Sequence, residues 1–513
     1  MLAPSIASSR ELELKLELPG DEFYRLGESP LLKASAEAHA RKTLRSIYFD
    51  TPEHDLAKAR ISLRLRNDGG NQWLQTVKAG EEPKGGLSDV AQSEVLLEKC
   101  ELDLDRIGDK RLRREIKKIC DKSDLKPVFE TIVDRTTHLI RHEDCTVELA
   151  LDEGRVEADG QSRQFREVEL ELLSGSPLGL LTVARELFSS FEIRPSQSSK
   201  AARGYRLVRQ EPEIAHPLLA QKVTLQQSDS ARDAFAAILR SSAEQVIANQ
   251  RVVLETGEVE AVHQMRVGLT RLRSALRSIR PYTKAPWITE LESDAQNVVR
   301  SVGNLRDADV LIAEIYTPIA EANSNDVPGF PSLLQTLKAH RDAAYKEVVA
   351  SLDKGAWTRL LVTMILSPQL LETGGKFAEP VATVAGECLE RRWKKVLKYG
   401  KRLDSLNLEE RHSMRKALKK LRYNCEFFQT LYDHEAQSFI KRVKKMQELF
   451  GAINDVRMAE RLIALALEQR RKNSKALAAA GYILGRHEAN VPLVWSKAKR
   501  EWERLEKPSG FWR

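Results

Sequence analysis

The sequence ELELKLEL, residues 11–18, alternates charged and apolar side chains without interruption. In a β-strand, side chains two residues apart share a face and lie about 6.6–6.8 Å apart. Glu11, Glu13, Lys15 and Glu17 therefore point to one side, and four leucines point to the other. The stretch predicts a strand with one apolar face and one charged face, and three of the four charges on that face are carboxylates.

Two other segments sort their charges by sign in the same way. RISLRLR, residues 60–66, puts arginines on one face, and REVELEL, residues 166–172, puts three glutamates on one face. A strand with a polar face in water is the ordinary explanation for each segment alone. A solvated face usually mixes signs, however. The sorted signs favour a curved sheet whose charged faces line an interior while the leucines pack outward.

The spacing of the carboxylates suggests what such an interior would bind. Two carboxylates about 7 Å apart repel by about 2 kcal/mol at an effective dielectric near 20. A divalent cation relieves this repulsion, and Mg²⁺ commonly combines one or two carboxylates with substrate phosphates. Guanidinium groups pair with phosphate oxygens in a planar fork. The acidic and basic strands therefore predict one site for a metal and a phosphate chain.

The chain divides into a β-rich part and a helical part. Alternation of period two also appears at residues 71–78, and a charged helix is expected at 103–120. Prolines at 212 and 217 mark a linker, after which the apolar spacing becomes helical. We predict a multidomain α+β protein with a β-module at 1–210, a linker at 211–222 and an all-α module at 223–513.

Composition and charge restrict the class of protein. Residues 1–212 carry 34 Lys and Arg against 38 Asp and Glu, whereas the rest of the 513 residues carry 48 against 36. A basic half of this kind is typical of proteins that meet polyanions. The five cysteines are scattered without a C-x-x-C pair, which argues against a disulfide framework or a zinc site. We find no apolar run of about 18 residues and no signal peptide, so we expect a cytoplasmic location without a membrane span.

The helical part contains an internal repeat. HQMRVGLTRLR at 263–273 aligns with HSMRKALKKLR at 412–422. About 40 residues after the start of each lies a related stretch, GNLRD at 303–307 and GAIND at 451–455. The duplication predicts two copies of one four-helix bundle, at about 223–370 and 371–513.

In each copy, a stripe of basic residues at helical spacing runs beside the apolar face of the same helix. The stripes comprise His263, Arg266, Arg273 and Arg277 in the first copy and His412, Arg415, Lys419 and Arg422 in the second. A solvated helix face is the ordinary alternative, but such faces usually intersperse acids for i,i+4 pairing. No acid occurs from His263 to Arg280. Because the stripes hold a single aromatic residue, Tyr423, a phosphate chain is a better ligand than nucleic acid.

The β-module resembles the CYTH domains, also called triphosphate tunnel metalloenzymes. The resemblance rests on the E-x-E-x-K of Glu11 to Lys15 and on later pieces in family order, which include YFDT at 48–51, SLRLR at 62–66, EVELE at 167–171 and SKAARG at 199–204. It implies an antiparallel β-barrel with a central tunnel that hydrolyses or cyclises a triphosphate with Mg²⁺ or Mn²⁺. The implied metal carboxylates are Glu11, Glu13, Asp152, Glu169 and Glu171, and the implied triphosphate contacts are Lys15, Arg64, Arg66, Lys78, Arg135 and Lys200.

The helical module resembles the CHAD domain, on AVHQMRV at 261–267 and LRDADV at 305–310. The resemblance implies two four-helix bundles facing each other across a basic groove, and binding of inorganic polyphosphate through the eight residues of the two stripes. Asp307 and Asp455 are interpreted as orienting partners of the basic residues. Thr270 stands where the family usually has an arginine, which removes one cation from the first stripe.

The combined expectation is a metal-dependent inorganic triphosphatase with an attached polyphosphate-binding domain, located in the cytoplasm or at polyphosphate granules. Gln92 and Leu96 depart from the family pattern, since the family often has Arg and Glu at those places. The alternatives are an organic triphosphatase acting on thiamine or nucleoside triphosphate, an adenylate cyclase, and a non-catalytic polyphosphate-binding protein whose β-module has lost activity.

Overall fold

A computed structural model describes residues 12–34, 40–80, 86–88, 91–121, 123–143, 145–211, 215–323, 327, 329–352, 355–468, 474–507 and 510–513. The chain forms two compact units. The first unit comprises residues 1–215 together with 353–366, and the second comprises 216–352 and 367–513. Glu11, the first residue of the predicted metal set, lies outside the described residues.

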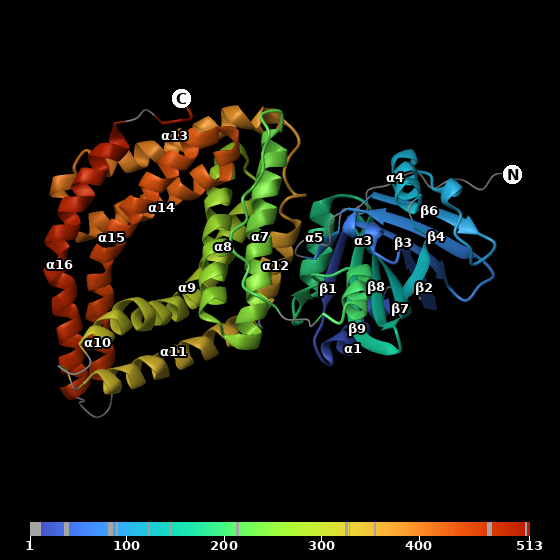
Figure 1. Cartoon of the computed structure of the whole chain (residues 1–513), viewed down its shortest axis with the longest axis horizontal. Helices are drawn as coiled ribbons and strands as arrows, with labels where there is room; N and C mark the ends of the chain where they lie inside the picture. Colours follow the sequence, from blue (N-terminus) through green and yellow to red (C-terminus); the bar gives the residue numbers. More distant parts are fainter. Residues whose placement is uncertain are drawn as a thin grey trace. The chain divides into compact units, whose positions relative to one another are not determined.

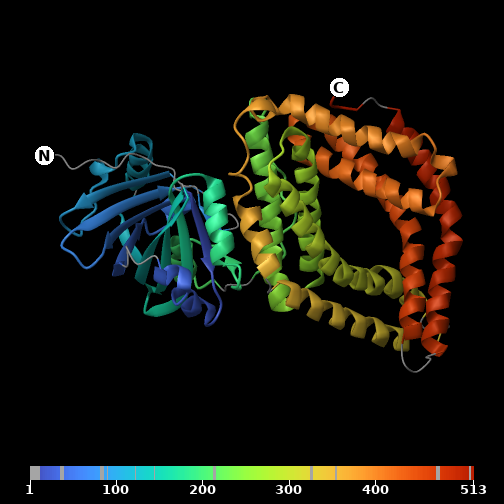
Figure 2. The same cartoon turned by 180° about the vertical axis from the view of Figure 1, so that it is seen from behind.

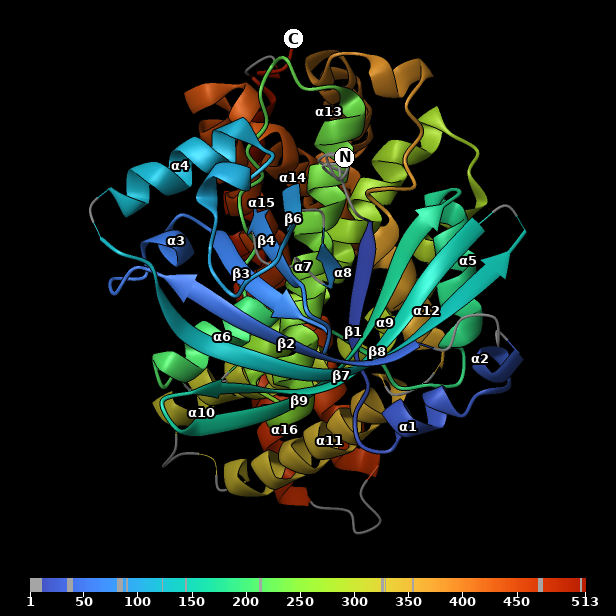
Figure 3. The same ribbon diagram turned by 90° about the vertical axis from the view of Figure 1, so that its right-hand side faces the viewer.

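The first unit is an antiparallel sheet with helices on its surfaces (Figure 3). Its strands are β1 (Glu13–Glu17), β2 (Ala40–Asp50), β3 (Ile61–Asn67), β4 (Trp73–Ala79), β5 (Leu87–Ser88), β6 (Ala91–Leu97), β7 (Lys126–His142), β8 (Cys145–Ala158), β9 (Gln161–Ser174) and β10 (Arg194–Pro195). Its helices are α1 (Glu22–Gly27), α2 (Pro30–Ala34), α3 (Asp55–Lys58), α4 (Lys110–Cys120), α5 (Pro177–Leu187), α6 (Lys200–Val208) and α12 (Gly355–Leu366). The predicted antiparallel sheet and the helix near residues 103–120 are confirmed.

The strands follow the order β10-β1-β9-β8-β7-β2-β3-β4-β6, and β5 pairs with β1. Among the described residues, β10 and β6 are not hydrogen-bonded to each other, so the sheet is open in its pairing where a closed barrel was expected. The chain itself connects the two edges. β5 pairs with β1 through Glu13–Ser88 and Leu14–Leu87, and β6 begins three residues after β5 ends.

The charged and the apolar side chains of the alternating strands lie on opposite faces of this sheet, as expected. Leu14, Leu16, Leu63 and Leu65 are fully buried. Leu63 packs in an apolar cluster with residues of α3 and α4, including Leu56, Leu112 and Ile116. The opposite face carries the charged residues, so the apolar face of the alternating strands is the outward, helix-covered one.

Helix α6 fills one part of the charged face. Its Tyr205 and Leu207 join Tyr48 and Phe129 in an apolar cluster, and Tyr205 Oη donates a hydrogen bond to Asp50 at 2.7 Å. Gly204 permits this approach, since a methyl group at that position would lie 2.0 Å from the Phe129 ring. Docking of α6 fixes Lys200, at its first turn, against the charged strands.

One helix from the C-terminal half of the sequence belongs to the first unit. Thr358 of α12 donates a hydrogen bond to the Phe191 carbonyl at 3.0 Å, and Arg185 of α5 donates to Thr363 at 2.9 Å. Gly355 begins the helix, and a methyl group there would lie 2.3 Å from the Ser189 carbonyl oxygen. The first unit is therefore completed by a segment that lies beyond the predicted boundary near residue 210.

The second unit is helical, as expected. Its helices are α7 (Ala231–Thr256), α8 (Val259–Ile279), α9 (Pro286–Val310), a π-helical turn (Leu311–Tyr316), α10 (Thr317–Ala322), α11 (Phe330–Leu352), α13 (Val381–Gly400), α14 (Leu408–Phe428), α15 (Asp433–Glu468) and α16 (Ser474–Glu506). In each repeat the four long helices form two hairpins joined at a corner, α7/α8 with α9/α11 and α13/α14 with α15/α16 (Figures 1 and 2).

The repeat found in the sequence is present in the packing. A methyl group at Gly303 would lie 3.8 Å from Arg266 Nε, and one at Gly451 would lie 4.0 Å from Arg415 Nη2. The two copies also share a core, since Leu311 and Leu337 of the first pack in one cluster with Leu462 and Ile483 of the second. No helix among the described residues is both long and apolar enough to cross a membrane.

Candidate functional sites

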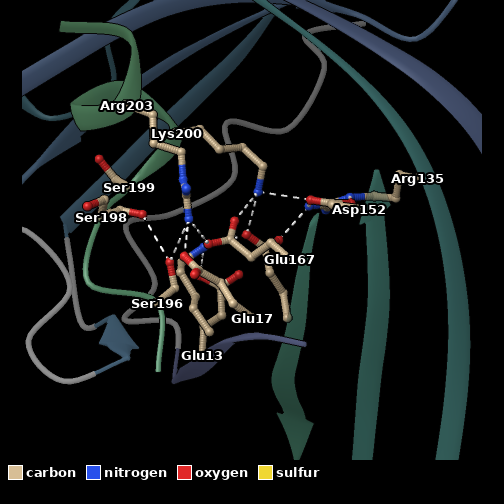
Figure 4. A network of polar contacts seen from close by, with 12 residues as sticks. Glu13, Glu17, Arg135, Asp152, Glu167, Ser196, Ser198, Ser199, Lys200 and Arg203 are labelled. Carbon is tan, nitrogen blue, oxygen red and sulfur yellow. Dashed lines mark hydrogen bonds and ion pairs between the residues drawn. The ribbon is translucent and has the colours of Figure 1, made fainter. Parts of the chain in front are cut away.

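The centre of the charged face is an ammonium group held by three carboxylates. Lys200 Nζ lies 2.9 Å from Asp152, 2.8 Å from Glu167 and 2.7 Å from Glu169 (Figure 4). All four residues are less than a tenth exposed. One oxygen from each of the three carboxylates lies within 4.8 Å of the others. Neighbouring strands bring these acids together, because Glu167 on β9 is directly opposite Asp152 on β8.

Two further cations extend this network on either side. Arg135 on β7 forms a paired hydrogen bond with both Asp152 oxygens at 2.7 Å and also contacts Glu169. Lys15 on β1 lies 2.6 Å from Glu169 and 2.9 Å from Glu13. Glu171 is opposite Glu13 in the β1–β9 register. The predicted Glu13, Lys15, Arg135, Asp152, Glu169 and Lys200 thus form one continuous set of contacts.

Helix α6 contributes a second cation one turn after Lys200. Ser199 caps the helix by accepting a hydrogen bond from the Ala202 amide at 3.0 Å. Arg203 contacts Glu17 and lies 3.8 Å from Glu167. The capped first turn therefore directs Lys200 and Arg203 to the same side of the helix, where both lie near Glu167 (Figure 4).

Two arginines on β3 form the basic part of the face. Arg64 donates to the Tyr48 hydroxyl at 3.3 Å, and Arg66 donates to Ser46 at 3.2 Å. Arg64 Nε is buried without a hydrogen-bond partner among the described residues. Unlike Arg135, these guanidinium groups donate to neutral hydroxyls, so their charge is available to an anion.

Beyond β3 the face continues onto β4 and β6. Lys78 lies opposite Gln92, and Thr76 lies opposite Glu94 and donates to it at 2.9 Å. Leu96 is about half exposed, at 48%. The two departures from the family pattern therefore flank Glu94 on this face, and one polar side chain and one apolar side chain stand where the family often has Arg and Glu.

The pKa values of the acidic residues shift in different directions. Burial raises the pKa of Glu13, and the neighbouring Glu169 raises it further. Burial would also raise the pKa of Glu169, but Lys15, Lys200 and Arg135 hold that pKa well below its usual range. Against the effect of burial, Lys200 and Arg135 lower the pKa of Asp152. Glu169 is therefore the ionised centre of the network, whereas Glu13 takes up a proton more readily than Asp152 or Glu169.

The cations of the basic part repel one another. Burial, together with Arg64 and Arg135, lowers the pKa of Arg66 to about 9. Arg64 and Arg66 together lower the pKa of the Tyr48 phenol against the effect of burial. An anion bound beside Arg64 and Arg66 would relieve this repulsion.

Sequence reasoning missed two members of the network. Glu167 shares a strand face with Glu169 and Glu171, so its period-two spacing could have assigned it to the site. Arg203 follows Lys200 by three residues, which is the spacing of neighbours on a helix. Neither the ion pair from Arg203 to Glu17 nor the contact of Lys200 with three acids is visible in the sequence, because both depend on how α6 docks.

The second unit brings basic residues of both repeats together. The charges acting on Lys419 of α14 come from Arg415 and Arg422 on its own helix and from Arg266 on α8. His263 is also affected by the charge of Lys419. We call His263, Arg266, Arg415, Lys419 and Arg422 the first basic cluster. His412 lies at the edge of this cluster, where the charge of Arg415 acts on it.

The stripes themselves lack acids, as expected, but three of their cations form ion pairs with acids that lie outside the stripes. Asp307 lies 3.6 Å from Arg266, Glu292 lies 2.6 Å from Arg277, and Glu426 lies 3.0 Å from Arg422. Arg273 donates to the neutral Gln296 at 2.7 Å. Part of the charge is therefore compensated by Asp307 and Glu292 from the neighbouring helix α9 and by Glu426, which lies one turn after Arg422 on α14 itself.

The first basic cluster nevertheless retains unsatisfied donors. His412 Nδ1, Arg415 Nε, Arg422 Nε and the Tyr423 hydroxyl are buried without a hydrogen-bond partner among the described residues. Burial and three neighbouring arginines lower the pKa of Lys419 to about 7. Asp455, by contrast, has its pKa raised to about 6 by burial and by Glu314. Buried donors next to excess positive charge favour an anionic ligand.

Comparison with known proteins finds two families. The model of the CYTH domain matches residues 9–205, and the model of the CHAD domain matches residues 237–464. An inorganic triphosphatase of Haemophilus influenzae is 30% identical over 198 residues, which are 39% of this chain and 55% of that protein. This chain thus spans about half the length of that relative.

Two further comparisons cover the rest of the chain. An uncharacterized protein of Mycobacterium tuberculosis is 24% identical over 494 residues, which are 88% of this chain and 91% of that protein. The crystal structure of the CHAD domain from the plant Ricinus communis is 28% identical and has a TM-score of 0.51. It covers 58% of this chain and 99% of its own.

Proposed function

Because the chain contains a CYTH domain followed by a CHAD domain, we propose that it is a metal-dependent inorganic triphosphatase with a polyphosphate-binding helical unit. The observation that carries this proposal is the single interior face on which buried carboxylates adjoin arginines that have no acidic partner among the described residues. The similarity to an inorganic triphosphatase over the first unit supports the same substrate class.

The carboxylates fit a hard divalent cation. Asp152, Glu167 and Glu169 offer three oxygens within 4.8 Å of one another, and Glu167 Oε1 is buried without a hydrogen bond. Mg²⁺ and Mn²⁺ take oxygen ligands of this type. These three residues, with Glu13 and Glu171 beside them, would hold the ion. The bound ion would supply Lewis-acid neutralisation of charge on the transferring phosphoryl group.

The residues of the chain would supply binding and orientation. Arg64 and Arg66 would hold phosphate oxygens in planar forks, and Lys15, Lys78 and Arg135 would add charge along the same face. Arg203 would fix the orientation of Glu17 and Glu167, and Lys200, whose ammonium group would be displaced from the three carboxylates by the ion, would turn to the phosphate chain. Glu13, whose pKa is raised, is suited to accept a proton from an attacking water.

In the second unit we propose that the first basic cluster binds the anionic oxygens of inorganic polyphosphate. The buried donors of His412, Arg415 and Arg422 would be satisfied by phosphate oxygens, and Lys419 would be fully protonated beside the anion. The stripes offer no exposed aromatic platform for bases, which favours polyphosphate over nucleic acid.

The test is phosphate release from tripolyphosphate, ATP and thiamine triphosphate by the full-length protein with Mg²⁺ or Mn²⁺. We expect tripolyphosphate to be the preferred substrate and the Glu169→Gln variant to lose at least about 100-fold in rate. Glu153→Gln is the matched control, because Glu153 follows Asp152 on β8 but points to the exposed side. Production of cyclic AMP from ATP, preference for an organic triphosphate, or no turnover of any substrate would each overturn the proposal in favour of the corresponding alternative.

A further inference from the structure

A second group of cations lies further along α8 than the first basic cluster, around Arg273 and Arg277. Lys419 and Lys420 are consecutive residues, so their side chains leave the helix about 100° apart. The charges acting on Lys420 come from Arg273 and Arg277 on α8 and from Arg392 and Lys395 on α13. None of these residues acts on Lys419, whose neighbours are Arg266, Arg415 and Arg422. We call Arg273, Arg277, Arg392, Lys395 and Lys420 the second basic cluster.

A buried hydrogen-bond node holds the three helices of this cluster together. Ser278 of α8 donates to Asn424 of α14 at 2.9 Å, and Arg392 of α13 lies 3.5 Å from the same Ser278 hydroxyl. Asn424 also donates to the Lys420 carbonyl at 3.0 Å. Ser278 and Asn424 are almost completely buried. The node fixes Arg392 and Lys420 beside the Arg273–Arg277 part of α8.

The charge of this cluster is poorly compensated. Among the described residues, the acid that forms ion pairs here is Glu292, 2.6 Å from Arg277 and 3.6 Å from Arg280. Arg273 Nε is buried without a hydrogen-bond partner among the described residues. Burial and four neighbouring cations lower the pKa of Lys420 to about 8. Fixed positive charge with an unsatisfied buried donor is the arrangement expected of an anion site.

We propose that the second basic cluster is a separate anion-binding site, and that a long polyphosphate chain occupies both clusters at once. The proposal rests on the proposed polyphosphate-binding function and adds a selection for chain length. Two linked contacts on one ligand raise affinity without any new chemistry, provided that the ligand can span both. A short polyphosphate can occupy only one cluster at a time and gains nothing from the second.

The experiment measures binding of long-chain polyphosphate and of a short linear polyphosphate to the full-length protein at fixed ionic strength, with EDTA to stop metal-dependent hydrolysis. The second-cluster variant is Arg392→Gln/Lys420→Met, and the first-cluster variant is Arg415→Gln/Lys419→Met. The charge-matched control is Lys398→Met/Lys401→Met, since both lysines are exposed at the end of α13 outside either cluster.

We expect the second-cluster variant to lose at least about tenfold in affinity for the long chain and less than about threefold for the short chain, while the control stays unchanged. Lys395→Met, an exposed member of the same cluster, should reproduce a smaller loss for the long chain and guards against misfolding of the double variant. Equal losses for long and short chains would overturn the two-site assignment.

Other outcomes separate this proposal from the one on which it rests. If the second-cluster variant binds like the wild type and only the first-cluster variant is impaired, the second site is wrong and polyphosphate binding stands. If neither variant loses affinity, or if the wild type binds single-stranded RNA more tightly than polyphosphate at equal phosphate concentration, polyphosphate binding by the helical unit is itself wrong.

Discussion

The two charged regions of this protein solve the problem of like charges in opposite ways. In the acidic part of the first unit, each buried cation meets carboxylates, as Lys200 does with Asp152, Glu167 and Glu169. In the second unit, Lys419 lies among three arginines, and its pKa falls to about 7. The first region is organised before a ligand arrives, whereas the second remains repulsive until an anion binds. Compensated charge therefore suits catalysis, which needs fixed geometry, and uncompensated charge suits binding of a long anion.

The largest effect is expected from removing the cation at the centre of the compensated network. Lys200→Met should leave three buried carboxylates without their shared cation. We expect a loss of at least about 100-fold in triphosphatase rate and a destabilisation of about 3–5 kcal/mol, because removing one partner of a buried ion pair strands the other. Rate assays and urea unfolding of the full-length protein measure both quantities. Lys398→Met, an exposed lysine, is the control, and a Lys200→Met protein with wild-type rate and stability would show that the network is not needed.

A second test asks whether the network depends on the docking of α6. Gly204→Ala places a methyl group 2.0 Å from the Phe129 ring, so the helix or the ring must shift. We expect destabilisation of about 1–3 kcal/mol and a loss of activity, since Lys200 and Arg203 move with the helix. Gly481→Ala is the matched control, because Gly481 lies within α16 and a methyl group there meets nothing within 4 Å. That variant should gain up to about 1 kcal/mol from helix propensity. A Gly204→Ala protein as stable as the wild type would mean that α6 does not dock as described.

The sequence was sufficient to predict four of the strands, β1, β3, β4 and β9, and the two faces of each. Period two in ELELKLEL and REVELEL assigns each charge to a face, and the register then places Lys15 opposite Glu169. The same pattern could not show that Lys200 enters the acidic centre, because this contact depends on a helix packed through Gly204. Nor could it show that Glu292 and Asp307 compensate the basic stripes, since those acids come from another helix. The membership of α12 in the first unit depends on tertiary packing in the same way.

The lowered pKa values of Lys419 and Lys420 predict how the stability of the folded protein depends on pH. Lys419 has a folded pKa of about 7 against an ordinary value of 10.5. Between these values the unfolded chain holds a proton that the folded chain does not, so stability should rise as pH increases from about 7 toward 10. Lys420, with a folded pKa of about 8, should add to the rise.

Lys419→Met should therefore stabilise the unliganded protein at pH 7 and flatten its pH dependence, while weakening polyphosphate binding by about tenfold. Urea midpoints at pH 7 and pH 9, with and without polyphosphate, measure both effects. Lys398→Met should change neither the midpoint nor the affinity. A Lys419→Met protein that is less stable than the wild type at pH 7 would show that the first basic cluster is not repulsive in the free protein.

The smallest expected effect concerns salt. Each cation that contacts a single phosphate strand contributes about 0.7 to the slope of log affinity against log salt concentration. Arg266→Gln and Arg415→Gln, at equivalent places in the two repeats, should each reduce the slope for long-chain polyphosphate by about that amount. The two substitutions should lower the slope independently of each other, because the two arginines lie in different repeats. Arg266 lies beside Gly303 in the first repeat, and Arg415 lies beside Gly451 in the second. The hydrolysis of tripolyphosphate should keep its own salt dependence in both variants, since Arg266 and Arg415 belong to the second unit and not to the triphosphate site. A slope unchanged by either substitution would place the polyphosphate chain away from the repeated motif, and the difference between the two regions would then lie in packing alone and not in ligand binding.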